Sequence, residues 1–270
     1  MQATETFPTP GNVANLQLDA SGNLRHLLTL EGLEKSLLIG LLDDAQKFVT
    51  SPGDATARSQ SLAGRTVANL FFEASTRTRA SFDLAGKRLG ADVLNLDVNT
   101  SSRKKGESIL DTIYTLQAMQ CDVFVVRDAQ AGVPEFIVGH VAPHVSVLNA
   151  GESHLNHPTQ GLLDMLTIRD RLGRIEGLKV CIVGDIVHSR VARSNIRALR
   201  KLGATLFAGC DPTDVFYTGQ EQRVVETEQG YALHVPLPLP SGKIQVNRMS
   251  SDEIIVHIGN RKRIISLPHT

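Results

Sequence analysis

Residues 66–90, TVANLFFEASTRTRASFDLAGKRLG, contain the pattern that decides the fold. The run 66–72 is apolar and begins with β-branched residues, which predicts a short buried strand. Residues 75–90 are predicted to form a helix, because apolar residues recur along one stripe and Gly90 can end it. A buried strand that leads directly into an amphipathic helix is the repeating unit of an α/β protein.

The same unit recurs after this stretch, and a further helix is expected before it. We expect further strands at 92–96, 123–126, 145–148, 179–183 and 204–207. We expect further helices at 27–49, 107–119, 134–140, 159–172 and 190–202. Near-continuous apolar strands that alternate with helices predict an α/β fold with a parallel sheet covered on both faces.

The chain is predicted to have four parts: a polar N-terminal arm at 1–24, a main α/β domain at 25–158, the start of a second α/β domain at 159–208, and a small β-sandwich-like tail at 211–270. The tail has no helical stripe, and we expect short antiparallel strands at 231–235, 243–246, 253–258 and 262–267. The second domain would have only two strands, which are marginal alone. We therefore expect residues 175–208 either to be poorly ordered or to be covered by the tail or a partner chain.

The composition excludes several classes of function. The chain has 270 residues, 41% of them hydrophobic, so a packed core is expected. Lys and Arg together number 28, as do Asp and Glu, which argues against a nucleic-acid partner. No apolar run is long enough to span a membrane. The three cysteines are far apart, which favours a reducing cytoplasm over a disulfide framework.

Residues 75–79, STRTR, are the strongest chemical signal. The first turn of a helix offers unpaired N–H groups and a positive dipole end, and Arg77 adds a bidentate fork, so this segment could hold a phosphate. The plainer interpretation is that Ser75 merely caps the helix while Arg77 and Arg79 are solvated. The residues alone support both interpretations about equally.

Three further clusters have a functional and a plain interpretation. The polar loop 100–108, which contains Ser101 and Lys105, is either a solvated loop or a phosphate-handling flap. His157 and Gln160 either begin a helix or point, with Arg127, into a cleft at the strand ends. His154 and His157 lack companion ligands for zinc. Residues 183–190 resemble half a dinucleotide fingerprint, but GxGxxG, GxxxxGK[ST] and GxSxG are all absent.

In this order, the clusters resemble the catalytic chain of the aspartate carbamoyltransferase family. The matching pieces are FFEASTRTRASF (71–82), NTSSRKKGES (99–108), VVRDAQAG (125–132), NAGESHLNHPTQGLLDM (149–165) and VGDIVHSRVARSN (183–195). STRTR alone would also fit ornithine carbamoyltransferases, whereas KGES and the last piece point to the aspartate enzymes. The resemblance covers about residues 20–208. It implies transfer of a carbamoyl group from carbamoyl phosphate to L-aspartate, in pyrimidine biosynthesis.

The resemblance also implies roles for single residues. Arg127 and His157 would polarise the carbonyl oxygen, and Gln160 would hold the carbamoyl amide. The phosphate would be held by the first turn of the helix: Ser75, Thr76, Arg77 and Thr78. Such preorganised donors suit a transition state that builds negative charge on the carbonyl oxygen and the leaving phosphate.

The remaining implications concern partners. Ser101 and Lys105 would reach into a neighbouring subunit's site, which implies a homotrimer with shared active sites, and Arg190 would bind an aspartate carboxylate. Arg77, Lys105, Arg127 and His157 would be the catalytic group. The family leaves room for a regulatory chain and needs no metal or organic cofactor.

The resemblance ends near residue 208, before the later substrate-binding loops of the family's second domain. Residues 211–268 instead resemble the small α-crystallin-like β domain of arsenite-transporter-type ATPases, without the ATPase core. Two hypotheses follow: an aspartate carbamoyltransferase with an impaired aspartate site, or a non-catalytic phosphate-binding fusion protein with an appended interaction domain. The sequence does not rank a natural fusion, a frame error and an engineered chimera.

Overall fold

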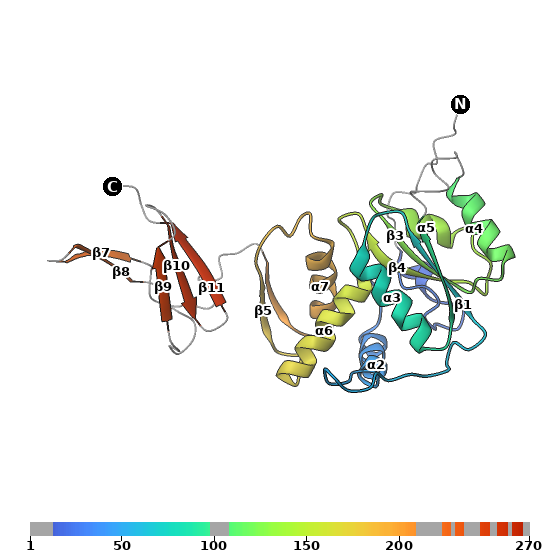
Figure 1. The fold of residues 1–270 in the computed structure, drawn as a ribbon, viewed down its shortest axis with the longest axis horizontal. Coiled ribbons are helices and arrows are strands. Elements are labelled where there is room, and N and C mark those ends of the chain that lie inside the picture. Colours follow the sequence, from blue (N-terminus) through green and yellow to red (C-terminus); the bar gives the residue numbers. More distant parts are fainter. Residues whose placement is uncertain are drawn as a thin grey trace, which may run out of the picture. The chain divides into compact units, whose positions relative to one another are not determined.

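The computed structural model describes residues 13–97 and 108–208, together with five strands after residue 222. The chain divides into two compact units, Met1–Gly209 and Cys210–Thr270, which are coloured from blue to orange and from orange to red in Figure 1. Among the described residues, no helix is both long and apolar enough to cross a bilayer.

The first unit alternates helices and strands almost throughout. Its elements are α1 (Ala14–Gln17), α2 (Lys35–Gln46), β1 (Thr66–Phe71), α3 (Thr76–Arg88), β2 (Asp92–Asp97), α4 (Ile109–Ala118), β3 (Val123–Asp128), α5 (Val133–Val138), β4 (Ser146–Glu152), α6 (Pro158–Leu172), β5 (Lys179–Ile182), α7 (Arg190–Lys201) and β6 (Thr205–Ala208). The order confirms the predicted α/β class.

Four of these strands form one parallel sheet in the order β2-β1-β3-β4. Successive side chains of β1 point to opposite faces, so Ala68 and Leu70 join one core cluster and Val67 and Phe71 another. The first cluster includes residues of α4 and α5, and the second includes Phe82 of α3. Helices therefore cover both faces, as Figure 1 shows. The arrangement brings the carboxyl ends of the strands to one edge.

The helix expected at 27–49 is shorter than predicted, because α2 begins only at Lys35. Before it, the chain runs beside β4: the Leu27 N–H donates to the Val147 carbonyl at 2.9 Å, and the Asn149 N–H donates to the Leu27 carbonyl at 2.9 Å. The leucines in this stretch are buried, as they would be in a helix, but they reach the core from an irregular segment of bends and turns. A run of buried leucines therefore did not distinguish the two conformations.

From residue 13 onward the expected N-terminal arm is anchored to the domain. The Gln17 side chain is fully buried, and its Oε1 accepts hydrogen bonds from the N–H groups of Leu28 and Thr29 at 2.7 and 2.9 Å. These bonds satisfy two buried backbone donors that no strand partner reaches. Residues 1–12 lie outside the described part of the chain.

The second α/β segment has the two strands that the sequence predicts. β5 and β6 pair in parallel, and Val180, Ile182 and Leu206 pack against the core cluster that α6 and α7 share. The two helices approach closely, since a Cβ on Gly161 of α6 would lie 3.2 Å from the Ser194 Cβ of α7. This packing joins the two-stranded sheet to the rest of the unit.

Amide hydrogen exchange is expected to be at least about tenfold faster in β5 than in β3. Each strand of the pair β5–β6 has one neighbour, and β5 is only half-buried, whereas β3 lies between β1 and β4. Mass spectrometry of peptides spanning 179–182 and 123–128 measures the difference. β2, an edge strand of the larger sheet, is the matched control. Equal protection of β5 and β3 would contradict poor order in residues 175–208.

The second unit contains only short antiparallel strands among its described residues. β7 (Arg223–Thr227) pairs with β8 (Gly230–His234), and β10 (Glu253–Ile258) lies between β9 (Ile244–Arg248) and β11 (Arg261–Ser266). The strand pattern follows the sequence prediction except for β7, which was not expected.

Candidate functional site at the carboxyl ends of the strands

The start of α3 has the form of an anion-binding site. Ser75 occupies the N-cap position with extended backbone (φ −157°, ψ 104°), but its side chain makes no capping hydrogen bond. The interpretation in which the Ser75 hydroxyl caps the helix is therefore not what the structure shows. The first-turn N–H groups remain uncapped by a side chain, and Thr76 and Arg77 are exposed beside them. These N–H donors and the positive end of the helix dipole favour the binding of an oxyanion.

Glu73, two residues before the N-cap Ser75, joins two arginines from other elements. Its Oε1 accepts from Nη2 of Arg127 at 3.0 Å, and its Oε2 accepts from Nη1 of Arg190 at 3.1 Å. Arg127 lies near the end of β3 and is 8% exposed, while Arg190 begins α7. One carboxylate therefore holds cations from both α/β segments at the same edge of the sheet.

Arg127 has further partners that fix its position. Its Nη1 lies 3.3 Å from the Thr78 hydroxyl on α3 and 3.4 Å from the Ala150 carbonyl on β4. The next residue, Gly151, has φ +124°, and a Cβ there would lie 3.2 Å from Nη1 of Arg127 and 3.2 Å from Cζ of Arg190. Only glycine accommodates both this backbone conformation and this approach.

The charges in this cluster bias its titration. Burial raises the pKa of Glu73, but hydrogen bonds and charge from Arg190 and Arg127 outweigh this and leave it below its usual range. Burial, helped by the charges of Arg190 and Arg127, lowers the pKa of His157 to about 4. His157 is therefore neutral near pH 7, and its Nδ1 lies 3.4 Å from the Thr159 hydroxyl. If Nδ1 accepts this hydrogen bond, Nε2 carries the ring proton, and the Nε2–H group can donate a hydrogen bond to a carbonyl oxygen.

The His157 ring is expected to titrate below about pH 5. Protonation would place a third cation beside Arg127 and Arg190 in a buried position, where Glu73 is the one carboxylate among the described residues that offsets the charge. Proton NMR of the imidazole C–H signals over pH 3.5–8 measures the midpoint, and His157→Asn identifies the signal by its loss. A midpoint above pH 6 would contradict the neutral, hydrogen-bond-donating ring.

Two family models match parts of the chain. Residues 25–170 match the family model of the aspartate/ornithine carbamoyltransferase carbamoyl-P binding domain, which is more than half of the chain. The chain belongs to the aspartate/ornithine carbamoyltransferase family. Residues 228–270 match a second model, the HSP20-like domain found in ArsA, in accord with the separate second unit.

Solved members of the carbamoyltransferase family resemble the first unit. An aspartate transcarbamoylase from Trypanosoma cruzi, in complex with aspartate and phosphate, is 32% identical with a TM-score of 0.58, and the match covers 71% of this chain and 58% of that one. For the catalytic subunit of the M. jannaschii enzyme, identity is 34%, the TM-score 0.60 and the coverage 68% and 60%. The chain thus spans less than two thirds of either relative.

Residues of the carbamoyltransferase motifs come together from four elements, α3, β3, α6 and α7. Thr78 and Arg127 are in direct contact, Arg190 joins them through Glu73, and His157 is the N-cap of α6. The other residues of the predicted set lie at the start of α3 or one turn into α6: Ser75, Thr76, Arg77 and Gln160. Ser101 and Lys105 fall outside the described residues.

Glu73 is the residue of this cluster that the sequence analysis did not single out. Its position just after β1 was a usable signal, because polar residues at carboxyl ends of parallel strands face the ligand edge of such sheets. Within the described ranges, no group of three or more His, Cys, Asp or Glu side chains could hold a metal ion.

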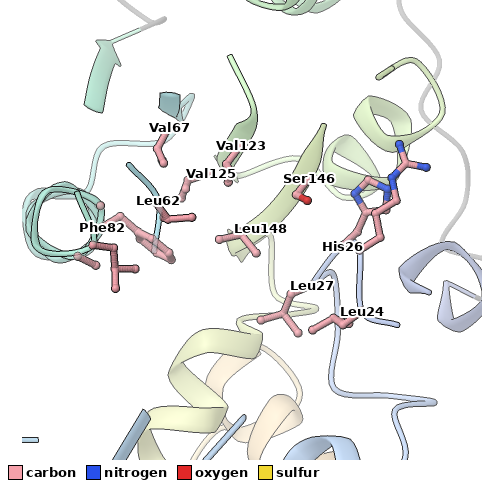
Figure 2. Close-up of a pocket in the computed structure, with 14 residues that line it drawn as sticks. Leu24, His26, Leu27, Leu62, Val67, Phe82, Val123, Val125, Ser146 and Leu148 are labelled. Atoms are coloured by element: carbon pink, nitrogen blue, oxygen red, sulfur yellow. The ribbon is translucent and has the colours of Figure 1, made fainter. Parts of the chain in front are cut away.

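An apolar hollow of about 360 Å³ lies away from this cluster, beside the α3 face of the sheet. Figure 2 shows it between Phe82 and Leu62 on one side and Leu24 and Leu27 on the other. His26 lines one end, but its Nδ1 accepts a hydrogen bond from the Val147 N–H at 3.0 Å. The hollow shares no residue with the charged cluster, so we do not include it in the candidate site.

Proposed function

We propose that the chain binds carbamoyl phosphate at the carboxyl ends of β1, β3 and β4 and transfers its carbamoyl group to L-aspartate. The observation that supports this most directly is the cluster of Arg127, Arg190 and His157 beside the uncapped start of α3. In this reaction the aspartate amine attacks the carbonyl carbon and a C–N bond forms. The C–O bond to phosphate breaks, and the amine releases a proton.

Each site residue has a separate role in the proposed reaction. The phosphate is bound by the first turn of α3, where Arg77 and the N–H groups after Ser75 converge with the hydroxyls of Thr76 and Thr78. Arg127 and the neutral His157 donate hydrogen bonds to the carbonyl oxygen, which becomes more negative as the amine attacks. Holding the amine and the carbonyl in contact supplies much of the remaining acceleration.

The other parts of the proposal concern aspartate and the assembly. Arg190 binds an aspartate carboxylate, and Gln160 holds the amino group of carbamoyl phosphate. Ser101 and Lys105 enter the site from a neighbouring subunit of a homotrimer, and the trimer leaves room for a regulatory chain. The reaction takes place in the cytoplasm, as a step of pyrimidine synthesis, and uses no metal or organic cofactor.

The second candidate function is phosphate binding without turnover. Two observations favour it: the chain spans about three fifths of its solved relatives, and a separate unit that matches an HSP20-like domain follows at residue 210. In that case the first unit would bind carbamoyl phosphate or phosphate, and the appended β unit would bind a partner.

One pair of measurements tests both candidates. The purified full-length chain is assayed for steady-state formation of N-carbamoyl-L-aspartate, and its affinity for inorganic phosphate is measured by calorimetry. Turnover that His157→Ala abolishes supports the transferase. Phosphate binding without turnover supports the second candidate, and the absence of both contradicts the proposed site.

A further inference from the structure

Gln160 is held by a side chain to which no role has been given so far, that of Asp164. Gln160 and Asp164 are four residues apart on α6, which places them on one face of the helix. The Gln160 Nε2 donates to the Asp164 Oδ1 at 2.9 Å, and the Asn195 Nδ2 of α7 donates to the Asp164 Oδ2 at 2.7 Å. All three side chains are half-buried between the helices.

The chemistry of these groups sets the direction of the Gln160 amide. An ionised carboxylate can only accept hydrogen bonds, so Gln160 must turn its NH₂ group toward Asp164. The amide oxygen, Oε1, then points to the other side of the side chain. Because Asn195 donates to the second oxygen of the carboxylate, Asp164 is itself held in place. Within the described part of the chain, no hydrogen bond to the Gln160 Oε1 accompanies these contacts.

We propose that Asp164 is a positioning residue that makes the site selective for carbamoyl phosphate over acetyl phosphate. The proposal rests on the proposed function, in which Gln160 faces the carbamoyl amino group. With Asp164 in place, Oε1 accepts a hydrogen bond from that amino group. Acetyl phosphate has a methyl group at the same position and cannot donate, so it leaves Oε1 without a donor, which costs binding free energy.

Calorimetric titration of the full-length protein with carbamoyl phosphate, acetyl phosphate and inorganic phosphate tests this inference. We expect wild type to prefer carbamoyl over acetyl phosphate by about tenfold or more, the size of one hydrogen bond to an otherwise unpaired acceptor. Asp164→Ala frees the Gln160 amide to rotate, so the ratio should fall to near one while the affinity for inorganic phosphate stays within about twofold.

Asp164→Asn is the matched variant that should restore selectivity. Its Oδ1 can still accept from the Gln160 Nε2. The NH₂ group of the new amide can donate a hydrogen bond to the Oδ1 of Asn195, which is buried and has no hydrogen-bond partner among the described residues. We therefore expect Asp164→Asn to keep most of the wild-type ratio. Thermal unfolding of each variant checks that the α6–α7 packing is preserved.

The outcomes separate this inference from the proposed function. If wild type binds inorganic phosphate but does not distinguish carbamoyl from acetyl phosphate, the positioning role is wrong and the phosphate site stands. An unchanged ratio in Asp164→Ala, or an equal loss of affinity for all three ligands, also overturns it. If wild type binds none of the three, the proposed function and the inference fail together.

Discussion

Replacing Arg77 with alanine is expected to weaken the binding of inorganic phosphate by about a hundredfold. A charge-assisted hydrogen bond contributes about 1.5–3 kcal/mol, and the upper end of that range corresponds to a hundredfold change in affinity. Arg77 is exposed and, among the described residues, takes part in none of the ion pairs of the fold. The variant should therefore fold normally, and calorimetry with phosphate measures the loss directly.

Arg88→Ala is the control for this measurement. It removes the same charge from the last residue of the same helix, far from the uncapped N-terminus. We expect phosphate affinity to change by less than about twofold, since exposed charges separated by more than a Debye length are largely screened in salt. Comparable losses in the two variants would mean that net charge, and not the start of α3, determines binding. No loss in Arg77→Ala would place the phosphate elsewhere.

The elements of the fold were predictable where periodicity and length agreed. Strands β1 and β3 are short apolar runs bounded by polar turns, and α3 has an apolar stripe that ends before Gly90. The segment 27–33 was not predictable in the same way. Its leucines satisfy a helical pattern, but the backbone of Leu27 pairs with β4, more than a hundred residues further along the chain, and the N–H groups of Leu28 and Thr29 donate to Gln17. Local pattern cannot detect such a long-range partner.

In the candidate site, too, some residues were predictable from the sequence and others were not. Arg127, His157 and Arg190 were predictable because they stand at strand ends or helix starts in recognisable motifs. The bridging role of Glu73 was not, since it depends on α7 reaching the end of β1. Asp164 likewise looks like an ordinary polar residue on a helix until Asn195 of the neighbouring helix is placed against it. Pairings between elements appear only when the helices are packed.

A second buried acid, outside the site, gives the protein a measurable pH dependence. Glu135 lies in the first turn of α5, is 7% exposed, and has an Oε2 that is buried without a hydrogen-bond partner in the described structure. Burial, and then the charge of Glu152, raise the pKa of Glu135 from 4.5 to about 7. Glu152 is fully buried too, but it accepts hydrogen bonds from the Gly132 N–H and from Asn149 and Asn156.

The raised pKa determines the sign of the effect on stability. Below about pH 4.5 Glu135 is protonated in both the folded and the unfolded chain, so its ionisation takes nothing from the free energy of unfolding. Between pH 4.5 and 7 only the unfolded chain releases the proton readily, so stability is lost as the pH rises. Above pH 7 the folded protein carries an ionised, poorly solvated carboxylate, and the loss is complete.

Glu135→Gln is therefore expected to stabilise the protein by roughly 2 kcal/mol at pH 8 but by only about 0.5 kcal/mol at pH 5, where the unfolded chain has begun to release the proton, since the amide resembles the protonated acid and does not ionise. Urea unfolding followed by circular dichroism measures both values; the chain has no tryptophan to report by fluorescence. Burial lowers the pKa values of His26 and His157 to about 4, so these residues make stability fall as the pH falls. Both proteins share this effect, so it cancels in the difference between their free energies of unfolding at each pH. Asp54→Asn, which neutralises an exposed carboxylate before β1, should leave stability unchanged at both pH values. An equal gain for Glu135→Gln at pH 5 and pH 8 would show that packing, and not ionisation of Glu135, is responsible.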